Sequence, residues 1–203
     1  MFIALIVLAF ISPWQELSSI ISNALGLSGA NKASISISSK VGEAIVFIDD
    51  KEVGKTPFED NNLKPGSHKF RLEKEDESSE FYKDFERTIY LEEGTQVVIN
   101  WDLGPGDNFS SGEVYFFKKK LTQEDNSTVS ILVDPESSKV YFDGAIQEGH
   151  PIIINHVKEG YHKIIIQKEG YIGEELEVKT KKGYDLFVEI KLFPVPIDIE
   201  QLE

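Results

Sequence analysis

An internal duplication constrains the fold of this chain more than any other feature of its sequence. The segment Val46–Lys74 aligns without a gap on Val140–Lys168 when the numbering is shifted by 94 positions. Over the longer alignment of 34–75 with 128–169, 12 of 42 positions are identical. Sequence similarity at a fixed spacing indicates that one structural unit is present twice. We therefore expect two similar domains in tandem.

The apolar residues of both copies follow the two-residue period of β-strands. In the last strand of each copy, Thr95–Leu103 and Tyr184–Leu192, bulky or apolar side chains occupy every second position. Alternation that is shared between two copies is typical of half-buried antiparallel strands. Because helical periodicity is almost absent after residue 33, we expect an all-β chain of two small antiparallel β-sandwiches.

Four pairs of matched residues lie in the turns between these strands or at the start of a strand. Aspartate opens a tight turn, proline starts an edge strand because it cannot donate a ladder hydrogen bond, and glycine supplies positive φ in a type II turn. A histidine then begins the next strand and is expected to face the core. These structural positions are Asp49, Pro57, Gly66 and His68 in the first copy and Asp143, Pro151, Gly160 and His162 in the second.

The segment between the copies contains one further predicted strand. Val114 and Phe116 lie on one face of 111–120, and Tyr115 and Phe117 lie on the other. This strand either completes the first sandwich or bridges the two. The polar stretch 121–127 that follows is expected to be an interdomain hinge.

The N-terminus differs in kind from the rest. Residues 2–11 are ten consecutive apolar residues, and an amphipathic stretch continues to Gly26. A bilayer span needs about 20 apolar residues, so the segment matches a signal-peptide core or the end of a transmembrane helix that starts upstream of Met1. The alternative is a buried N-terminal helix of a soluble protein. We expect a membrane anchor or export signal.

Composition excludes several classes of function. The formal net charge is −14, and the longest basic run is three lysines at 118–120, so nucleic acid binding is not expected. The chain has no cysteine and therefore no disulfide or cysteine-ligated metal.

Several motifs resemble those of the PEGA domain. They are Val46-Phe47-Ile48-Asp49, Gly54-Lys55-Thr56-Pro57, Leu63-Lys64-Pro65-Gly66-Ser67-His68 and, in the second copy, Lys168-Glu169-Gly170-Tyr171. The second copy departs from the pattern at 147–150. The resemblance covers 34–104 and 128–192. It implies a sandwich similar to immunoglobulin-like or prealbumin-like domains of bacterial and archaeal cell envelopes, without an enzymatic activity attached to the motif.

We found no constellation that predicts catalysis, a cofactor or a metal site. Gly54-Lys55-Thr56 lacks the glycine and the helix that a phosphate-binding loop requires. His150, His156 and His162 are spaced by six, and we expect structural roles for them rather than zinc binding. Four aromatic residues are instead candidates for contacts with a ligand or partner, because aromatic faces stack on sugars or bury in partner proteins: Tyr115, Phe117, Tyr171 and Phe187. The competing interpretation is that they complete a core.

The sequence thus predicts a non-enzymatic envelope protein on the extracytoplasmic side of a cell membrane. Its sandwiches would serve as spacer, adhesion or assembly modules that contact other envelope proteins. The alternative is a carbohydrate-binding module that engages cell-wall or S-layer glycan through surface aromatics. The expected organisation is an anchor or signal segment (1–27), a linker (28–33), the first sandwich (34–120), the hinge (121–127), the second sandwich (128–193) and an extended tail (194–203).

Overall fold

The computed structural model describes residues 32–75, 81–121 and 126–196, and within these ranges the fold is all-β, as predicted. No α-helix is assigned there, and no helix of these ranges is long and apolar enough to cross a bilayer. The expected anchor or signal segment, 1–27, lies outside the described residues.

Matched strands recur in the two copies. The first copy contains β1 (Ala33–Ser38), β2 (Ala44–Ile48), β3 (Lys51–Lys55), β4 (Phe58–Leu63), β5 (Gly66–Lys74), β6 (Phe85–Leu91) and β7 (Gln96–Asp102). A 3-10 turn, η2 (Asp107–Phe109), precedes β8 (Ser111–Lys119). The second copy contains β9 (Ser127–Asp134), β10 (Lys139–Phe142), β11 (Ala145–Gln147), β12 (Ile152–Val157), β13 (Gly160–Gln167), β14 (Glu174–Thr180) and β15 (Tyr184–Lys191).

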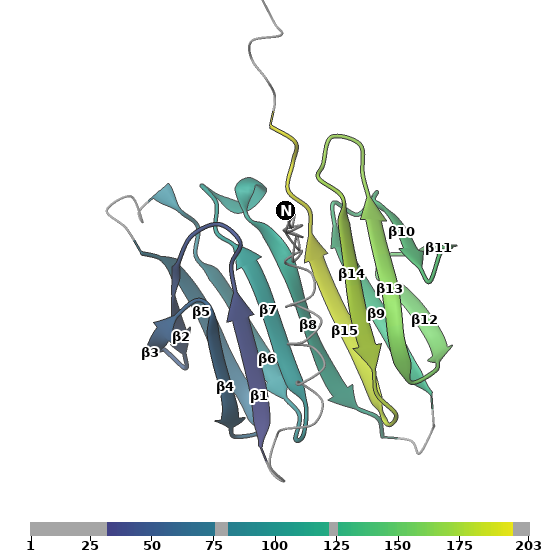
Figure 1. Ribbon diagram of the computed structural model, residues 1–203, viewed down its shortest axis with the longest axis horizontal. Helices are drawn as coiled ribbons and strands as arrows, with labels where there is room; N and C mark the ends of the chain where they lie inside the picture. The colour runs from purple at the N-terminus through teal and green to yellow at the C-terminus, as the bar shows by residue number, and fades with distance from the viewer. Residues whose placement is uncertain (1–31, 76–80, 122–125, 197–203) are drawn as a thin grey trace, which may run out of the picture.

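The strands form one large sheet and two small ones (Figure 1). The large sheet has seven strands in the order β12-β9-β15-β8-β7-β1-β4 and draws on both copies. The small sheets have the orders β3-β2-β5-β6 and β11-β10-β13-β14, each from one copy. Each small sheet packs on the half of the large sheet that comes from its own copy, so each copy is a two-layer sandwich.

Strand β8 joins the two copies at the centre of the large sheet. It pairs antiparallel with β7 on one edge and with β15 on the other. Val114 packs in the hydrophobic core of the first copy, whereas Tyr115 and Phe117 pack in the core of the second. Because neighbouring residues of a strand point to opposite sides of a sheet, the two cores lie on opposite faces. We call the face that carries the first core the first face, and the other the second face.

The two copies are related by an approximate twofold axis along β8. The matched strands β7 and β15 flank β8, and each is antiparallel to it, so they run parallel to each other. A rotation about β8 exchanges these strands and also exchanges the two faces of the sheet. The interpretation in which this strand bridges the two sandwiches is therefore confirmed.

Two expectations about the sheets need correction. The sandwiches are not purely antiparallel, because β1 pairs in parallel with β7, and β9 pairs in parallel with β15. The stretch 121–127, expected to be a hinge, is also not the only connection between the two copies. Eight paired positions between β8 and β15 join them through backbone hydrogen bonds, and residues 122–125 lie outside the described residues.

The matched turn residues occupy the conformations that their side chains favour. Asp49 and Asp143 have φ of 53° and 49°, in the left-handed region that aspartate tolerates. Pro57 and Pro151 directly precede β4 and β12, which are the edge strands of the large sheet. Gly66 and its counterpart Gly160 have φ of 140° and 151°. The glycine requirement is confirmed, but these angles exceed the value of about 80° in a type II turn, so that turn type is wrong.

Because both copies pair with β8, we expect them to unfold together. Replacing Phe117, which is 8 % exposed, by alanine should lower the free energy of unfolding by about 3 kcal/mol through the lost burial and the cavity left behind. In urea we expect a single unfolding transition with a lower midpoint. Circular dichroism and intrinsic fluorescence, used to monitor it, should give the same midpoint. The exposed Leu121→Ala should leave the midpoint unchanged. Two separated transitions in the Phe117 variant would contradict a single cooperative unit.

Candidate binding cleft

The four aromatic residues singled out in the sequence do not form one surface. Tyr115 and Phe117 are each 8 % exposed and belong to the second core, so the expectation that they contact a ligand from the surface is wrong. Phe187 lies on the first face, half-buried, with its ring stacked on Phe116 at 5.2 Å between centroids. Tyr171 is half-buried and forms an isolated bridge with Pro194.

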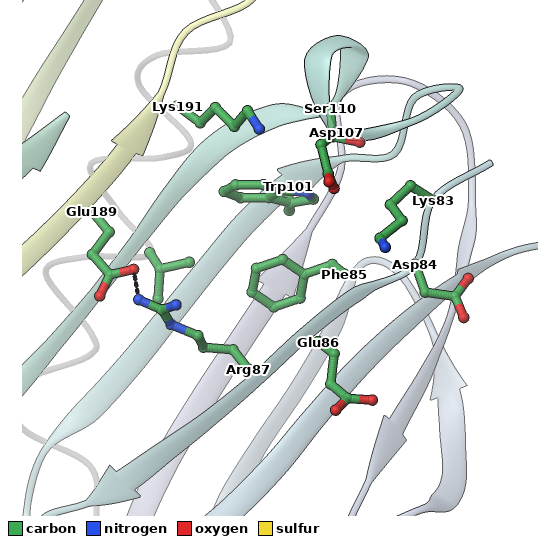
Figure 2. A pocket seen from close by; sticks show the side chains of 11 residues that line it. Lys83, Asp84, Phe85, Glu86, Arg87, Trp101, Asp107, Ser110, Glu189 and Lys191 are labelled. Atoms are coloured by element: carbon green, nitrogen blue, oxygen red, sulfur yellow. Dashed lines mark hydrogen bonds and ion pairs between the residues drawn. The ribbon is translucent and has the colours of Figure 1, made fainter. Parts of the chain in front are cut away.

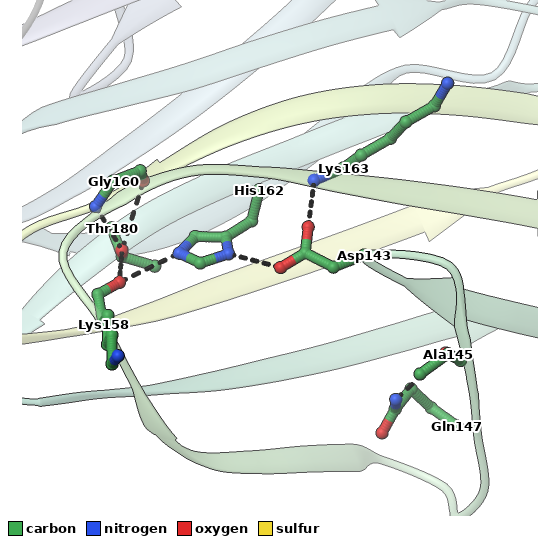
Figure 3. Close-up of polar contacts among 8 residues, drawn as sticks. All are labelled: Asp143, Ala145, Gln147, Lys158, Gly160, His162, Lys163 and Thr180. Atoms are coloured by element: carbon green, nitrogen blue, oxygen red, sulfur yellow. Dashed lines mark hydrogen bonds and ion pairs between the residues drawn. The ribbon is translucent and has the colours of Figure 1, made fainter.

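The matched aspartate and histidine form a repeated hydrogen-bonded lock rather than a site open for chemistry. His162 Nδ1 lies 2.7 Å from Asp143 Oδ2, and its Nε2 lies 2.9 Å from the Lys158 carbonyl oxygen (Figure 3). The Lys163 N–H donates to the second carboxylate oxygen, Oδ1, at 2.9 Å. Both ring nitrogens and both carboxylate oxygens are thus engaged.

The first copy repeats this lock almost to the tenth of an ångström. His68 Nδ1 lies 2.7 Å from Asp49 Oδ2, and His68 Nε2 lies 2.8 Å from the Lys64 carbonyl oxygen. Burial raises the pKa of Asp49, but hydrogen bonds from the Lys69 N–H and from His68 outweigh it and hold the pKa below its ordinary value. Each imidazole packs beside a core phenylalanine, Phe70 or Phe142, as expected of a histidine that faces the core, and it also fastens one turn to the next strand.

A buried polar cluster lies on the second face, where β7 and β8 pair. Glu113 is 4 % exposed, and its Oε1 accepts a hydrogen bond from Asn100 Nδ2 at 2.6 Å. Its other oxygen, Oε2, has no hydrogen-bond partner among the described residues. Burial raises the pKa of Glu113 to about 7, against the opposing influence of Lys40 and of the Asn100 hydrogen bond. Lys40 is itself paired with Glu174 at 3.5 Å.

Glu113 should therefore make stability fall with rising pH. The pKa of its carboxyl is about 7 in the folded chain, against an ordinary value of 4.5, so the folded chain binds the extra proton between these limits. The stability that this proton supplies is complete below pH 4.5 and is lost as pH rises through 7, by about 3 kcal/mol. Glu113→Gln should remove this slope in urea midpoints measured from pH 5 to pH 8. An unchanged slope would show that the carboxyl is not buried in solution.

On the first face, a cleft of about 280 Å³ opens where the two copies meet (Figure 2). It lies between β6, the edge strand of the first small sheet, and the large sheet beneath it. The first copy supplies Phe85 and Trp101, whose rings are 4.8 Å apart and tilted by 43°. The second copy supplies Glu189 and Lys191 from β15. The cleft is thus a composite of both copies.

An ion pair crosses this cleft from one copy to the other. Arg87 on β6 pairs with Glu189 on β15 (Figure 2). Lys191 pairs with Asp134 at 3.5 Å. The remaining charged side chains that line the cleft are Lys83, Asp84, Glu86 and Asp107. Three cationic groups and four acidic groups therefore surround an aromatic wall, and their charges nearly cancel.

A second hollow of about 750 Å³ adjoins this cleft and shares Lys191 with it. The turn η2 contributes to both, with Asp107 in the cleft and Asn108 and Phe109 in the hollow. Phe109 is 50 % exposed there, and Tyr171 lines the same hollow. Of the aromatic candidates from the sequence, Tyr171 is thus placed beside an open cavity.

Neither hollow carries the groups of a metal centre. No cluster of three or more histidine, aspartate or glutamate side chains with metal-binding geometry was found among the residues that the structure describes. The sequence pattern did not single out Phe85, Trp101 or Arg87 as site residues. Trp101 looked like one more inward residue of an alternating strand, and only the sheet pairing between the copies brings these side chains to one place.

The comparison with known proteins agrees with the architecture. A family model described as PEGA domain matches two segments, 32–107 and 126–195, which together cover well over half of the chain. No curated protein matches the chain significantly. The two matched segments coincide with the two sandwiches, and the unmatched residues between them include the shared strand β8. The chain therefore belongs to the PEGA domain family, with two copies of the domain in tandem.

Proposed function

We propose that the protein is a non-catalytic, membrane-tethered envelope component whose two PEGA domains form one rigid spacer on the extracytoplasmic side. The observation that carries this proposal is the continuous seven-stranded sheet. Tandem domains joined only by a linker reorient freely, whereas a backbone ladder shared by two domains fixes their relative orientation. A spacer needs that fixed orientation in order to hold its two ends at a set separation.

Further contacts between the copies support rigidity. Lys181 Nζ donates to the Gly94 carbonyl oxygen at 3.1 Å, and the Tyr184 hydroxyl donates to the Glu93 carbonyl oxygen at 3.3 Å. Burial lowers the pKa of Lys181, against the opposing influence of Glu159. At the other end of the strands, the Lys40–Glu174 ion pair joins the first copy to β14. Side-chain contacts thus brace the shared strand at both of its ends.

Rigidity can be measured directly because the chain has no cysteine. Spin labels on Glu52→Cys and Ile146→Cys, which are exposed equivalent positions of the two copies, should give one narrow distance distribution by pulsed electron spin resonance. The pair Glu52→Cys and Tyr90→Cys, within the first copy, measures the width that the labels themselves add. A distribution between copies that is much broader than this control would overturn the rigid spacer.

The tether rests on the apolar run at 2–11 and is tested separately. Full-length protein expressed in a bacterial host should remain with the membranes after alkaline carbonate extraction. Replacing Leu5 and Val7 together by aspartate should release it, since a charge in the hydrocarbon region costs about 2.5–3.5 kcal/mol per residue. The exposed Leu121→Asp is the control and should stay with the membranes. Extraction of the unaltered protein would count against a tether while leaving the rigid sheet untouched.

A further inference from the structure

We propose that the cleft between β6 and the large sheet is a binding site for a neutral oligosaccharide, with Trp101 as its stacking wall. This inference goes beyond the spacer role and does not rest on it. It names a site made by both copies, where neither domain alone could supply all the groups.

The cleft exists because the first small sheet, which covers the first face of the large sheet, ends at β6. This strand is the edge of the small sheet, and the large sheet continues beneath it toward the second copy. Directly across from Trp101 on β8 stands Gly112. A Cβ at that position would come within 2.1 Å of the Asn100 carbonyl oxygen, and its φ of 146° also favours glycine. No side chain from this position of β8 therefore occupies the space next to the indole.

The chemistry of the walls fits a polyhydroxylated ligand. An aromatic face packs against the apolar C–H face of a sugar ring, while acids and cations at the rim bond to its hydroxyl groups. Asp107 and Lys83 lie at that rim and are exposed. Pairing between Arg87 and Glu189 holds both groups in place, so that little side-chain entropy remains to be lost on binding.

The balance of charge argues against an ionic ligand. Three cations and four acids line the cleft, and two of the cations, Arg87 and Lys191, already have carboxylate partners. An anionic ligand would have to compete with these partners, and it would also approach a chain of net charge −14. A neutral ligand escapes both penalties.

The adjoining hollow sets the expected length of the ligand. It continues from the cleft past Lys191 and carries Phe109 and Tyr171, both aromatic and partly exposed. Aromatic side chains at successive points along a path suit successive rings of one chain. We therefore infer an oligosaccharide of several units rather than a single sugar.

The test is a titration of the full-length protein, kept in a detergent without a sugar headgroup, with neutral cello-, malto-, manno- and chitohexaose. At least one should bind by calorimetry and change the fluorescence of Trp101, and hexagalacturonate should bind more weakly. Trp101→Ala should weaken binding about tenfold or more. Because Trp101 also packs against Phe85, the exposed Lys83→Ala and Asp107→Ala provide the test in chains that keep the aromatic packing, and they should weaken binding several-fold.

The matched control is Tyr90→Ala, which removes an aromatic side chain 59 % exposed on β6 that does not line the cleft. It should leave affinity unchanged. The proposal is overturned if none of the neutral hexaoses binds, if the acidic oligosaccharide binds more tightly, or if Lys83→Ala and Asp107→Ala bind as the unaltered protein does. A failure here leaves the spin-label distances unaffected, so the two proposals can fail independently.

Discussion

Backbone hydrogen bonding on both edges of one strand holds this molecule together. Strand β8 pairs with β7 from the first copy and with β15 from the second, so the two domains share a sheet rather than a surface. That position imposes a requirement on its sequence. Both faces of β8 need apolar side chains, because a core lies on each side, and Val114, Tyr115 and Phe117 supply them, although the second face also carries the buried Glu113. An ordinary half-buried strand would leave one core open to water.

Because of the twofold relation along β8, the contact between the copies on the first face of the large sheet corresponds to the contact on the second face. The side chains at these two contacts differ. On the first face, Phe85 and Arg87 of β6 meet Glu189 of β15 and leave an open cleft. After Lys74 the copies align with a shift of 89 positions, as in Thr95–Leu103 and Tyr184–Leu192, so the matched positions on the second face are Glu174, Leu176 and Asn100. There the buried Glu113 lies in place of open space. The same junction is thus a hydrogen-bonded seam on one face and an aromatic-walled cavity on the other. Duplication supplied the scaffold, and substitutions at a few matched positions changed the chemistry.

Local pattern was enough to predict much of this fold. The shared period of two, the matched aspartate turns and the prolines before β4 and β12 follow from rules that act over a few residues, and the structure confirms them. The double-faced apolar pattern of 111–120 left open whether this strand completes the first sandwich or bridges the two, and the pairing with β15 decides for the bridge. The parallel pairs of β1 with β7 and β9 with β15 could not be predicted in this way, because pairing of distant strands leaves no trace in local periodicity.

The cleft was beyond sequence reasoning for the same reason. Arg87 and Glu189 are about a hundred positions apart, and nothing near either residue indicates that they pair. The error at Tyr115 and Phe117 came from treating one face of that strand as exposed, when a second core covers it. Residues of a turn can be recognised from their neighbours in the chain, whereas residues of a composite cleft can be recognised only from their neighbours in space.

The direction of the strands bears on how this molecule would carry load. Strands β1 and β15 run parallel, since β1 is parallel to β7 and both β7 and β15 are antiparallel to β8. The described chain therefore enters the large sheet at one end of its strands and leaves it at the opposite end (Figure 1). Tension between these two points acts along the strands, so the ladders of β8 are pulled in shear. Many hydrogen bonds must then break together, whereas a force across the strands would open them one at a time. This topology would therefore resist a force along the strands better than a force across them.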